Sequence, residues 1–206
     1  MPKVGMEEIR REQILQAAYR CVAQKSINGT RMKDIAREAG ISQGVIHYYF
    51  QTKEKLLNEL LAWSLQEYLE GALNKITFEK NPVKRLKTLF KYQKQVVRER
   101  ADLVTVFYDF WVQGTKQPDV RDKMKEQFKL YRDFIHRIVQ EGVHMGTFKE
   151  EALDYVPGLT VGLLEGFAIQ QVIDPDCFDA SLLAEKSVEI LLHTMARDWD
   201  NPDNLG

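Results

Sequence analysis

The residues best suited to chemistry lie on the outer face of a short predicted helix that follows Ser42. This face carries Gln43, Gly44, His47 and Tyr48. Gln, His and Tyr side chains donate to phosphate oxygens and base edges, and Gln pairs well with adenine. A purely structural pair of helices would expose long Glu and Lys side chains instead. These residue types therefore predict a surface that contacts a nucleic acid.

Two short helices and a turn must position this surface. Thr30 is a predicted cap for the first helix, whose inner face carries Ile35 and Ala36. Gly40 ends that helix, because glycine takes the left-handed conformation without a side-chain penalty. Ser42 caps the second helix, and Ile46 fills the angle between the two. Two helices joined by a short turn that contains Gly are typical of a helix-turn-helix, whose second helix enters the major groove.

The segment from Ile14 to about Leu60 resembles the N-terminal domain of the TetR family of bacterial transcriptional repressors. That family's pattern runs from ILxAA through T-x-x-IAxxAG-[VI]-S-x-G-x-[IL]-YxYF to KExL. The matching residues are Ile14, Leu15, Ala17, Ala18, Thr30, Ile35, Ala36, Ala39, Gly40, Ile41, Ser42, Gly44, Ile46, Tyr48, Tyr49, Phe50, Lys53, Glu54 and Leu56. His47 departs from the pattern, since many members have Tyr there.

The resemblance implies an all-α fold of about nine helices, with a DNA-binding domain over residues 1–52 and an effector-binding and dimerisation domain over 53–206. The residues expected to contact DNA are Thr30, Ser42, Gln43, Gly44, His47, Tyr48, Tyr49 and Lys53. Gln43 and His47 are the candidates for base edges, whereas Thr30, Tyr48, Tyr49 and Lys53 are expected on phosphates. Gly44 would let the backbone approach the DNA closely.

Hydrophobic periodicity predicts helices along the rest of the chain, without strand alternation or repeats. The expected ranges are 9–24, 53–76, 83–98, 101–113, 119–144, 152–172 and 181–196. The helix over 53–76 would be about 35 Å long at 1.5 Å per residue. It is expected to act as a lever between the two domains.

The charge distribution fits a DNA-binding head on a separate body. The chain has a formal net charge of -1. Residues 1–55 contain ten Lys and Arg and six Asp and Glu, a net of +4, which leaves -5 for the remainder. A basic end on an acidic body is typical of a small nucleic-acid-binding domain joined to a domain with another role.

The two cysteines, Cys21 and Cys177, lie far apart in the sequence and lack partners at metal-ligand spacing. No disulfide framework, metal site or cofactor is therefore expected, although a redox switch stays open. The N-terminal segment has no apolar core of a signal peptide, and no stretch of about 18 apolar residues is apparent. A cytoplasmic protein without a membrane anchor is predicted.

The second domain is expected to bind a small molecule. Aromatic residues and two acids in apolar helices give the candidate effector site: Phe107, Tyr108, Asp109, Trp111, Tyr131 and Glu165. Aromatic residues at helical spacing are commonly core, but aromatic faces plus a carboxylate also suit a quaternary ammonium group. The N-terminal MPKVGMEEIRREQ and the DFW of residues 109–111 resemble the choline-responsive branch of the TetR family. A cationic or amphipathic effector is the resulting hypothesis.

The last two helices are expected to form a homodimer. Gly158, Gly162 and Gly166 recur every four residues and leave a smooth face that a partner helix can approach closely. Glu165 could instead make a hydrogen bond in that interface. In the TetR plan, the last two helices of each chain form a four-helix interface.

These patterns predict a homodimeric, ligand-responsive regulator, most simply a repressor that binds a palindromic operator in double-stranded DNA and leaves it when the effector binds. Two alternatives remain. One is an enzyme built from Asp109, Glu165, His136 and His144, although no nucleophile elbow, metal spacing or phosphate loop accompanies them. The other is a protein-binding adaptor without DNA binding, which the basic head argues against. The sequence identifies neither the effector, nor the operator, nor the sign of regulation.

Overall fold

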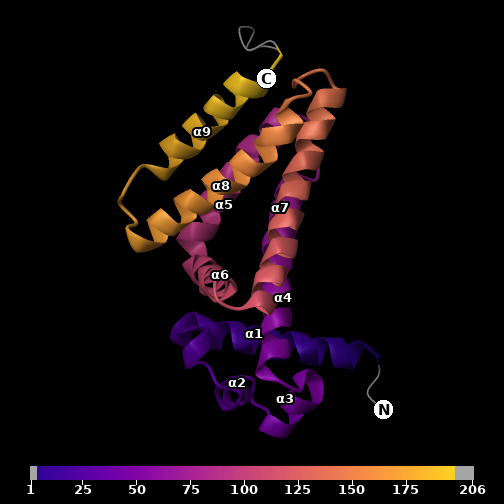
Figure 1. Ribbon diagram of the computed structural model, residues 1–206, viewed down its shortest axis with the longest axis vertical. Helices are drawn as coiled ribbons and strands as arrows, with labels where there is room; N and C mark the ends of the chain where they lie inside the picture. Colours follow the sequence, from indigo (N-terminus) through magenta and orange to yellow (C-terminus); the bar gives the residue numbers. More distant parts are fainter. Residues whose placement is uncertain (1–3, 198–206) are drawn as a thin grey trace. The chain divides into compact units, whose positions relative to one another are not determined.

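The computed structural model describes residues 4–197, which form nine helices (Figure 1). The helices are α1 (Val4–Gly29), α2 (Met32–Glu38), α3 (Gln43–Phe50), α4 (Lys53–Ile76), α5 (Pro82–Glu99), α6 (Ala101–Gly114), α7 (Pro118–His144), α8 (Ala152–Ile173) and α9 (Ala180–Met195). Within these residues the extended structure is limited to one isolated bridge between Phe148 and Ala196. The predicted all-α class is therefore confirmed.

The helix bounds agree with the sequence to within a few residues, except at the first helix. It begins at Val4 rather than Ile9 and continues to Gly29 across a kink at Ser26, where φ is 63° and ψ is 167°. Beyond the expected end at residue 24, the chain thus forms a kink followed by one further helical turn.

The chain divides into two compact units. The first comprises residues up to Tyr68 together with Thr105–Lys125, and the second comprises Leu69–Val104 and the residues from Glu126 onward. Most of helix α6, from Thr105 onward, thus belongs to the same unit as α1, α2 and α3, although 50 residues of sequence separate α6 from α3. This division differs from the boundary at residue 53, which stays a prediction about function.

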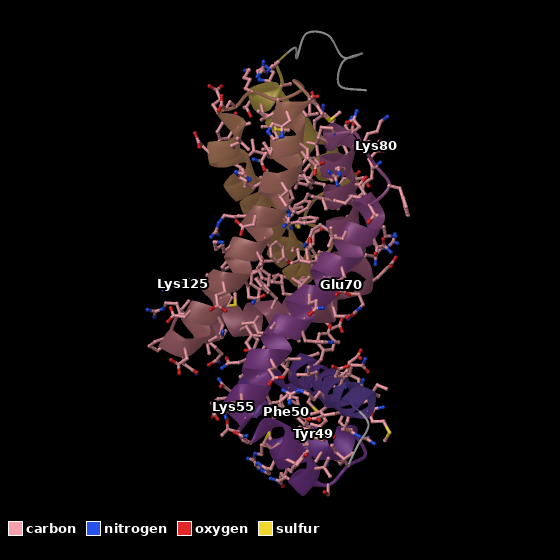
Figure 2. All side chains as sticks on the ribbon, turned by 90° about the vertical axis from the view of Figure 1, so that its right-hand side faces the viewer. Tyr49, Phe50, Lys55, Glu70, Lys80 and Lys125 are labelled. Atoms are coloured by element: carbon pink, nitrogen blue, oxygen red, sulfur yellow. The ribbon has the colours of Figure 1, made fainter. Side chains whose placement is uncertain are left out.

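The core of the first unit is formed by the residues that the motif requires. Ile14, Ile35 and Ile46 are fully buried, and Ala36 is buried where α2 passes α3. At the end of α3, Phe50 is buried whereas the neighbouring Tyr49 is only half-buried (Figure 2). The apolar face of α3 is therefore buried inside the unit, and its opposite face is exposed.

The core of the second unit is formed mainly by α5, α7, α8 and α9. Asn81 caps α5 by accepting from the amides of Val83 and Lys84, at 2.8 and 3.1 Å. From there Leu86 and Phe90 point into the core, where they join Val161, Leu164 and Leu191. In Figure 1, α5, α8 and α9 lie together.

Helix α8 is long and apolar enough to cross a membrane, judged by length and composition alone. The sequence-based expectation that no stretch reaches this limit is wrong for Ala152–Ile173. The helix nevertheless contains Pro157, Asp154 and Glu165, and residues such as Val156 and Leu164 are buried in the unit. About a third of this apolar stretch is buried in the unit, while Leu159 and Ile173 are exposed.

Candidate nucleic-acid interface

The turn between α2 and α3 has the geometry that the sequence predicts. Gly40 adopts φ of +65°, and the amide of Ile41 donates to the carbonyl of Ala36 at 3.0 Å. Ser42 then caps α3, since its hydroxyl accepts from the amide of Val45 at 3.3 Å. Only a glycine takes the positive φ without strain, so Gly40 fixes the angle at which α3 begins.

The exposed side chains of α3 are positioned by one another. The Nδ1 of His47 lies 3.0 Å from the carbonyl oxygen of Gln51, and its Nε2 lies 3.4 Å from Nε2 of Gln43. A carbonyl can only accept, so this contact requires the proton on Nδ1 and leaves Nε2 to accept from the Gln43 amide. The Gln43 carbonyl oxygen and its second N–H remain available to a base edge.

Tyr48 and Tyr49 form an edge-to-face pair, with ring centroids 5.2 Å apart and planes at 87°. Tyr48 is 71% exposed, which is unusual for a side chain with so much apolar surface. Its hydroxyl is free to reach a phosphate oxygen, while Tyr49 supports the ring from the side.

Gly44 lies on the same exposed face. A Cβ built at this position meets only the Ser42 hydroxyl, at 3.8 Å, so nothing inside the unit requires a glycine there. Glycine in a helix interior costs roughly 1 kcal/mol relative to alanine. The missing side chain instead leaves the α3 backbone open to close approach from outside.

Arg11 of α1 holds the end of α3 in place, a role that was not predicted from the sequence. Its guanidinium donates to the Tyr49 carbonyl at 3.1 Å and lies 4.8 Å from the centre of the Phe50 ring. It also donates to both carboxylate oxygens of Glu59, at 2.5 Å. One side chain thereby joins α1, α3 and α4. A basic residue one helical turn before the buried Ile14 and Leu15 is the only sequence signal for it.

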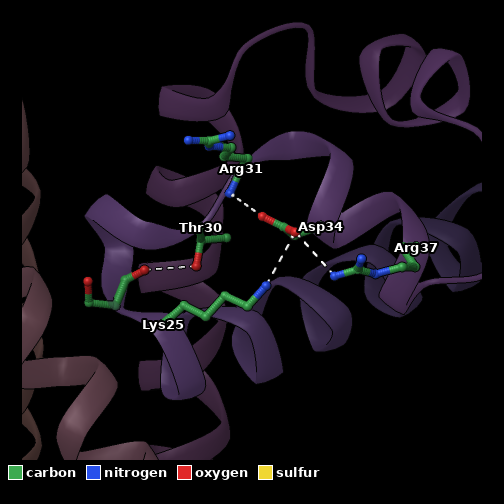
Figure 3. Close-up of polar contacts among 6 residues, drawn as sticks. Lys25, Thr30, Arg31, Asp34 and Arg37 are labelled. Carbon is green, nitrogen blue, oxygen red and sulfur yellow. Dashed lines mark hydrogen bonds and ion pairs between the residues drawn. The ribbon is translucent and has the colours of Figure 1, made fainter.

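The start of α2 differs from the prediction (Figure 3). The cap is Arg31 rather than Thr30, because the Asp34 carboxylate accepts from the Arg31 amide at 3.2 Å. Thr30 is completely buried, and its hydroxyl donates to the Ser26 carbonyl at 2.8 Å. In this conformation Thr30 cannot present its hydroxyl to a phosphate, so it positions α2 from within.

The Asp34 carboxylate forms ion pairs in addition to its hydrogen bond with the Arg31 amide. Lys25 and Arg37 lie 3.3 and 3.2 Å from its carboxylate (Figure 3). The hydrogen bond from Lys25, followed by the amide of Arg31 and the two positive charges, lowers the pKa of Asp34 below its ordinary value. The carboxylate therefore stays charged at neutral pH, and the start of α2 loses this support only under acid conditions.

Ile27 connects three parts of the first unit. Its amide donates to the Asp109 carboxylate of α6, and its carbonyl accepts from the Lys53 ammonium of α4 at 2.7 Å. Lys53 retains two further N–H groups that could meet a phosphate. The Asp109 contact differs from the expected role as partner of a cationic effector, because the sequence does not show that α6 lies against the kink in α1.

The predicted effector residues fall into both units. Phe107, Tyr108, Asp109 and Trp111 lie on α6 in the first unit; Phe107 and Tyr108 are in edge-to-face contact at 5.8 Å, and Trp111 is half exposed. Tyr131 and Glu165 lie in the second unit, where Tyr131 packs against the core. Burial raises the pKa of Glu165 to about 7, against an opposing effect of the Arg132 charge.

The cysteines and acids give no other site. Cys21 is buried, and burial raises the pKa of its thiol, whereas Cys177 is exposed. Over residues 4–197, no three His, Cys, Asp or Glu side chains are grouped so that they could hold a metal ion.

Known proteins match both halves of the chain. Residues 14–60 match the bacterial regulatory proteins of the tetR family, and residues 82–195 match the C-terminal domain of BetI-type transcriptional repressors. The HTH-type transcriptional regulator BetI of Agrobacterium fabrum is 30% identical over 121 residues, which cover 59% of this chain and 59% of that protein. The chain thus matches only about three fifths of that relative's length.

Two further matches extend over nearly the whole chain. BetI of Brucella suis is 24% identical over 195 residues, covering 93% of this chain and 96% of that protein. The crystal structure of a transcriptional regulator from Saccharomonospora viridis in complex with choline has a TM-score of 0.77 at 22% identity, covering 91% of this chain and 97% of that one. At this identity the structural match shows a shared fold.

The contacts of Arg11 predict that Arg11→Met destabilises the protein by about 1–2 kcal/mol, because it removes hydrogen bonds made by a charged group that is partly exposed. Methionine keeps much of the apolar stem against Phe50. Urea unfolding at a fixed protein concentration measures the change.

Arg10→Met is the matched control, since Arg10 is exposed and, within residues 4–197, bonds only to Gln13 on its own helix. We expect it to change the free energy of unfolding by less than about 0.5 kcal/mol. Equal effects of the two variants would show that Arg11 does not hold α3 in place.

Proposed function

Since the chain belongs to the tetR family of bacterial regulatory proteins and has a C-terminal domain of the BetI type, we propose that it is a homodimeric repressor that binds a palindromic operator and is released by a small cationic effector. It would act in the cytoplasm, where its DNA target lies. Its relatives are transcriptional regulators rather than enzymes.

The observation that carries this proposal is the exposed face of α3. Gln43 and His47 are held in place by hydrogen bonds, and Gly44 leaves the helix surface open between them. The helix is fixed from behind by Arg11 and the buried Ile46. A rigid helix with oriented polar side chains suits reading of base edges in the major groove.

Helices α8 and α9 supply the proposed dimer interface. A Cβ added at Gly158, Gly162 or Gly166 would meet open space within this chain. Leu159, Leu182 and Ile190 are large apolar side chains that are exposed on the same two helices. Exposed apolar residues beside a face without side chains favour a second copy of the pair, packed by closely approaching helices.

In the effector proposal, Glu165 provides the negative charge and Tyr131, in the same unit, provides a ring face. The choline complex of the Saccharomonospora viridis regulator supports choline as the first ligand to try. Glu165 is mostly buried, and its pKa of about 7 means that it carries a proton about half of the time at neutral pH. A bound cation would favour the ionised form.

Asp109 is then assigned to signal transfer rather than to ligand binding. It lies on α6 between Tyr108 and Trp111, and its carboxylate holds the Ile27 amide directly before α2. A shift of α6 on effector binding would act on the kink in α1, and through it on the orientation of α2 and α3. Such a shift lowers operator affinity only if the effector binds the shifted state more tightly.

The test of the DNA-binding role is selection from a pool of random duplexes with the purified protein, followed by titrations of the selected site. We expect a palindrome with half-sites about one helical turn apart or more. Gln43→Ala should weaken binding to that site about tenfold and relax its base preference, since a good bidentate contact contributes roughly 1–3 kcal/mol. Lys53→Met should weaken binding to all sequences and reduce the magnitude of the salt slope by about 0.9.

Gln16→Ala is the control for Gln43→Ala, because Gln16 is an exposed glutamine on α1 that bonds to Glu12. It should leave operator affinity unchanged. If no sequence is enriched at low salt, the repressor proposal fails and the alternative of a protein-binding adaptor gains support.

The environment of Glu165 predicts a pH-dependent affinity for choline. Below pH 7 the free carboxyl group holds a proton that the cation must displace, so affinity should rise by up to about tenfold per pH unit toward pH 7 and level off above it. Calorimetric titrations between pH 5.5 and 8.5 measure this dependence.

Two comparisons isolate the charge. Glu165→Gln should bind choline weakly and without the pH dependence, and 3,3-dimethyl-1-butanol, the uncharged isostere of choline, should show no pH dependence on the natural protein. Choline binding that Glu165→Gln leaves unchanged would remove Glu165 from the effector site.

A further inference from the structure

Helix α5 carries a row of cations that begins at Lys84, and the four that follow line one groove. Lys87, Lys91, Lys94 and Arg98 are separated by four, three and four residues, which places them on one face of the helix. These four span about 16 Å at 1.5 Å per residue. Their span exceeds the length of a single phosphate or carboxylate group several times over.

These four cations form one wall of a groove against α9. The groove has a volume of about 630 Å³, and α9 contributes Ser181, Ala184, Glu185 and Val188 to it. Val188 is buried and Ala184 half-buried, so they form an apolar floor beneath the charged wall. The volume lies in the range of sites that enclose small organic ligands, roughly 300–1,000 Å³.

The charges in the groove are poorly balanced. Four cations and one acid, Glu185, line the groove, and the charge of Lys94 also acts on Asp179, directly before α9. Lys94 donates to the Ser181 hydroxyl, and Arg98 pairs with Glu99 at 2.5 Å. Among the residues that the structure describes, Lys87 and Lys91 form no ion pair.

Three lysines on other helices are paired with acids of their own helix. Lys125 pairs with Asp122, Lys129 with Asp133 and Lys186 with Glu189, each three or four residues away along the helix. Such pairing is the usual arrangement of a solvated helix face. The α5 row lacks this pairing at Lys87 and Lys91, and like charges this close repel one another unless an anion lies between them.

The groove also uses a different side of α9 from the proposed dimer interface. Ser181, Ala184 and Val188 line the groove. Leu182, Lys186 and Ile190 lie on another face of α9, which is rotated about the helix axis by more than 90° from the groove-lining face. Dimerisation through this other face therefore leaves the groove open to a ligand.

We propose that the groove between α5 and α9 binds a small organic polyanion, with two or more phosphate or carboxylate groups along the row of cations and an apolar or planar part on Ala184 and Val188. Ammonium groups bind phosphates as point charges, and Arg98 can add paired hydrogen bonds. The site is distinct from the proposed effector site, since the two require ligands of opposite charge.

Calorimetric titration of the full-length protein at about 0.15 M salt tests the proposal with four probes. ADP has both the anionic groups and a planar ring, pyrophosphate has only the charges, and adenosine has only the ring. Citrate replaces phosphates by carboxylates and so distinguishes the two kinds of anion. We expect saturable binding of ADP or citrate, weaker binding of pyrophosphate, and no binding of adenosine.

The double variant Lys87→Gln/Lys91→Gln should weaken binding of the tightest probe by about tenfold or more without changing the thermal unfolding temperature. Both side chains are exposed, and neither pairs with an acid among residues 4–197. The control is Lys33→Gln/Lys116→Gln, which removes the same charge from two exposed lysines that do not line the groove. It should change the affinity by less than about threefold.

Two results would overturn the proposal. One is the absence of saturable binding by ADP, citrate and pyrophosphate at millimolar concentration. The other is an equal effect of the two double variants on probe affinity. If both weaken binding equally, the anion responds to the general charge of the protein; if neither does, it binds elsewhere, for example at the basic head.

Discussion

The arrangement of the DNA-binding head depends on how the peptide at Ile27 is held. Ser26 breaks α1 with a positive φ, and its carbonyl accepts from both the amide and the hydroxyl of Thr30. One residue later, Asp109 takes the Ile27 amide and Lys53 donates to the Ile27 carbonyl. These contacts fix where α2 begins. Gly40 then sets the angle at the start of α3, and Arg11 holds the end of α3 in place.

Carboxylates have different roles in this chain because their surroundings differ. Asp34 and Asp109 accept hydrogen bonds from the backbone amides of Arg31 and Ile27, and both hold helix ends in place. Glu165 lies mostly buried, where burial raises its pKa to about 7, so its charge is costly unless a cation compensates. For this reason we assign the structural role to Asp109 and the ligand-binding role to Glu165, although the sequence places both within apolar helices.

Local features of the head could be read directly from the sequence. The turn, the cap and the buried face depend only on residues close to one another in the sequence. The structure shows all three as predicted, at Gly40, at Ser42, and at Ile35, Ala36 and Ile46. The periodicity of α5 likewise depends only on its own turn-by-turn pattern.

Contacts between distant residues could not be predicted in this way. Asp109 and Ile27 are 82 residues apart, and Arg11 and Glu59 are 48 apart, so no local pattern joins them. The role of Thr30 could not be predicted either. A threonine before a helix can cap the helix or support it from the core, and the hydrogen bond to the Ser26 carbonyl shows that Thr30 does the latter. The sequence alone also does not show which residues of the apolar helix α8 are buried in the unit and which are exposed.

The central claim is that α3 is the helix that approaches DNA, and Gly44→Ala tests it most directly because stability and affinity should change in opposite directions. Alanine fits without a clash and should stabilise the protein by up to about 1 kcal/mol through its helix propensity. If the backbone of α3 approaches the DNA at this point, the same methyl group should lower affinity for the selected operator by about tenfold or more. A variant that is more stable and binds equally well would contradict this account of the interface.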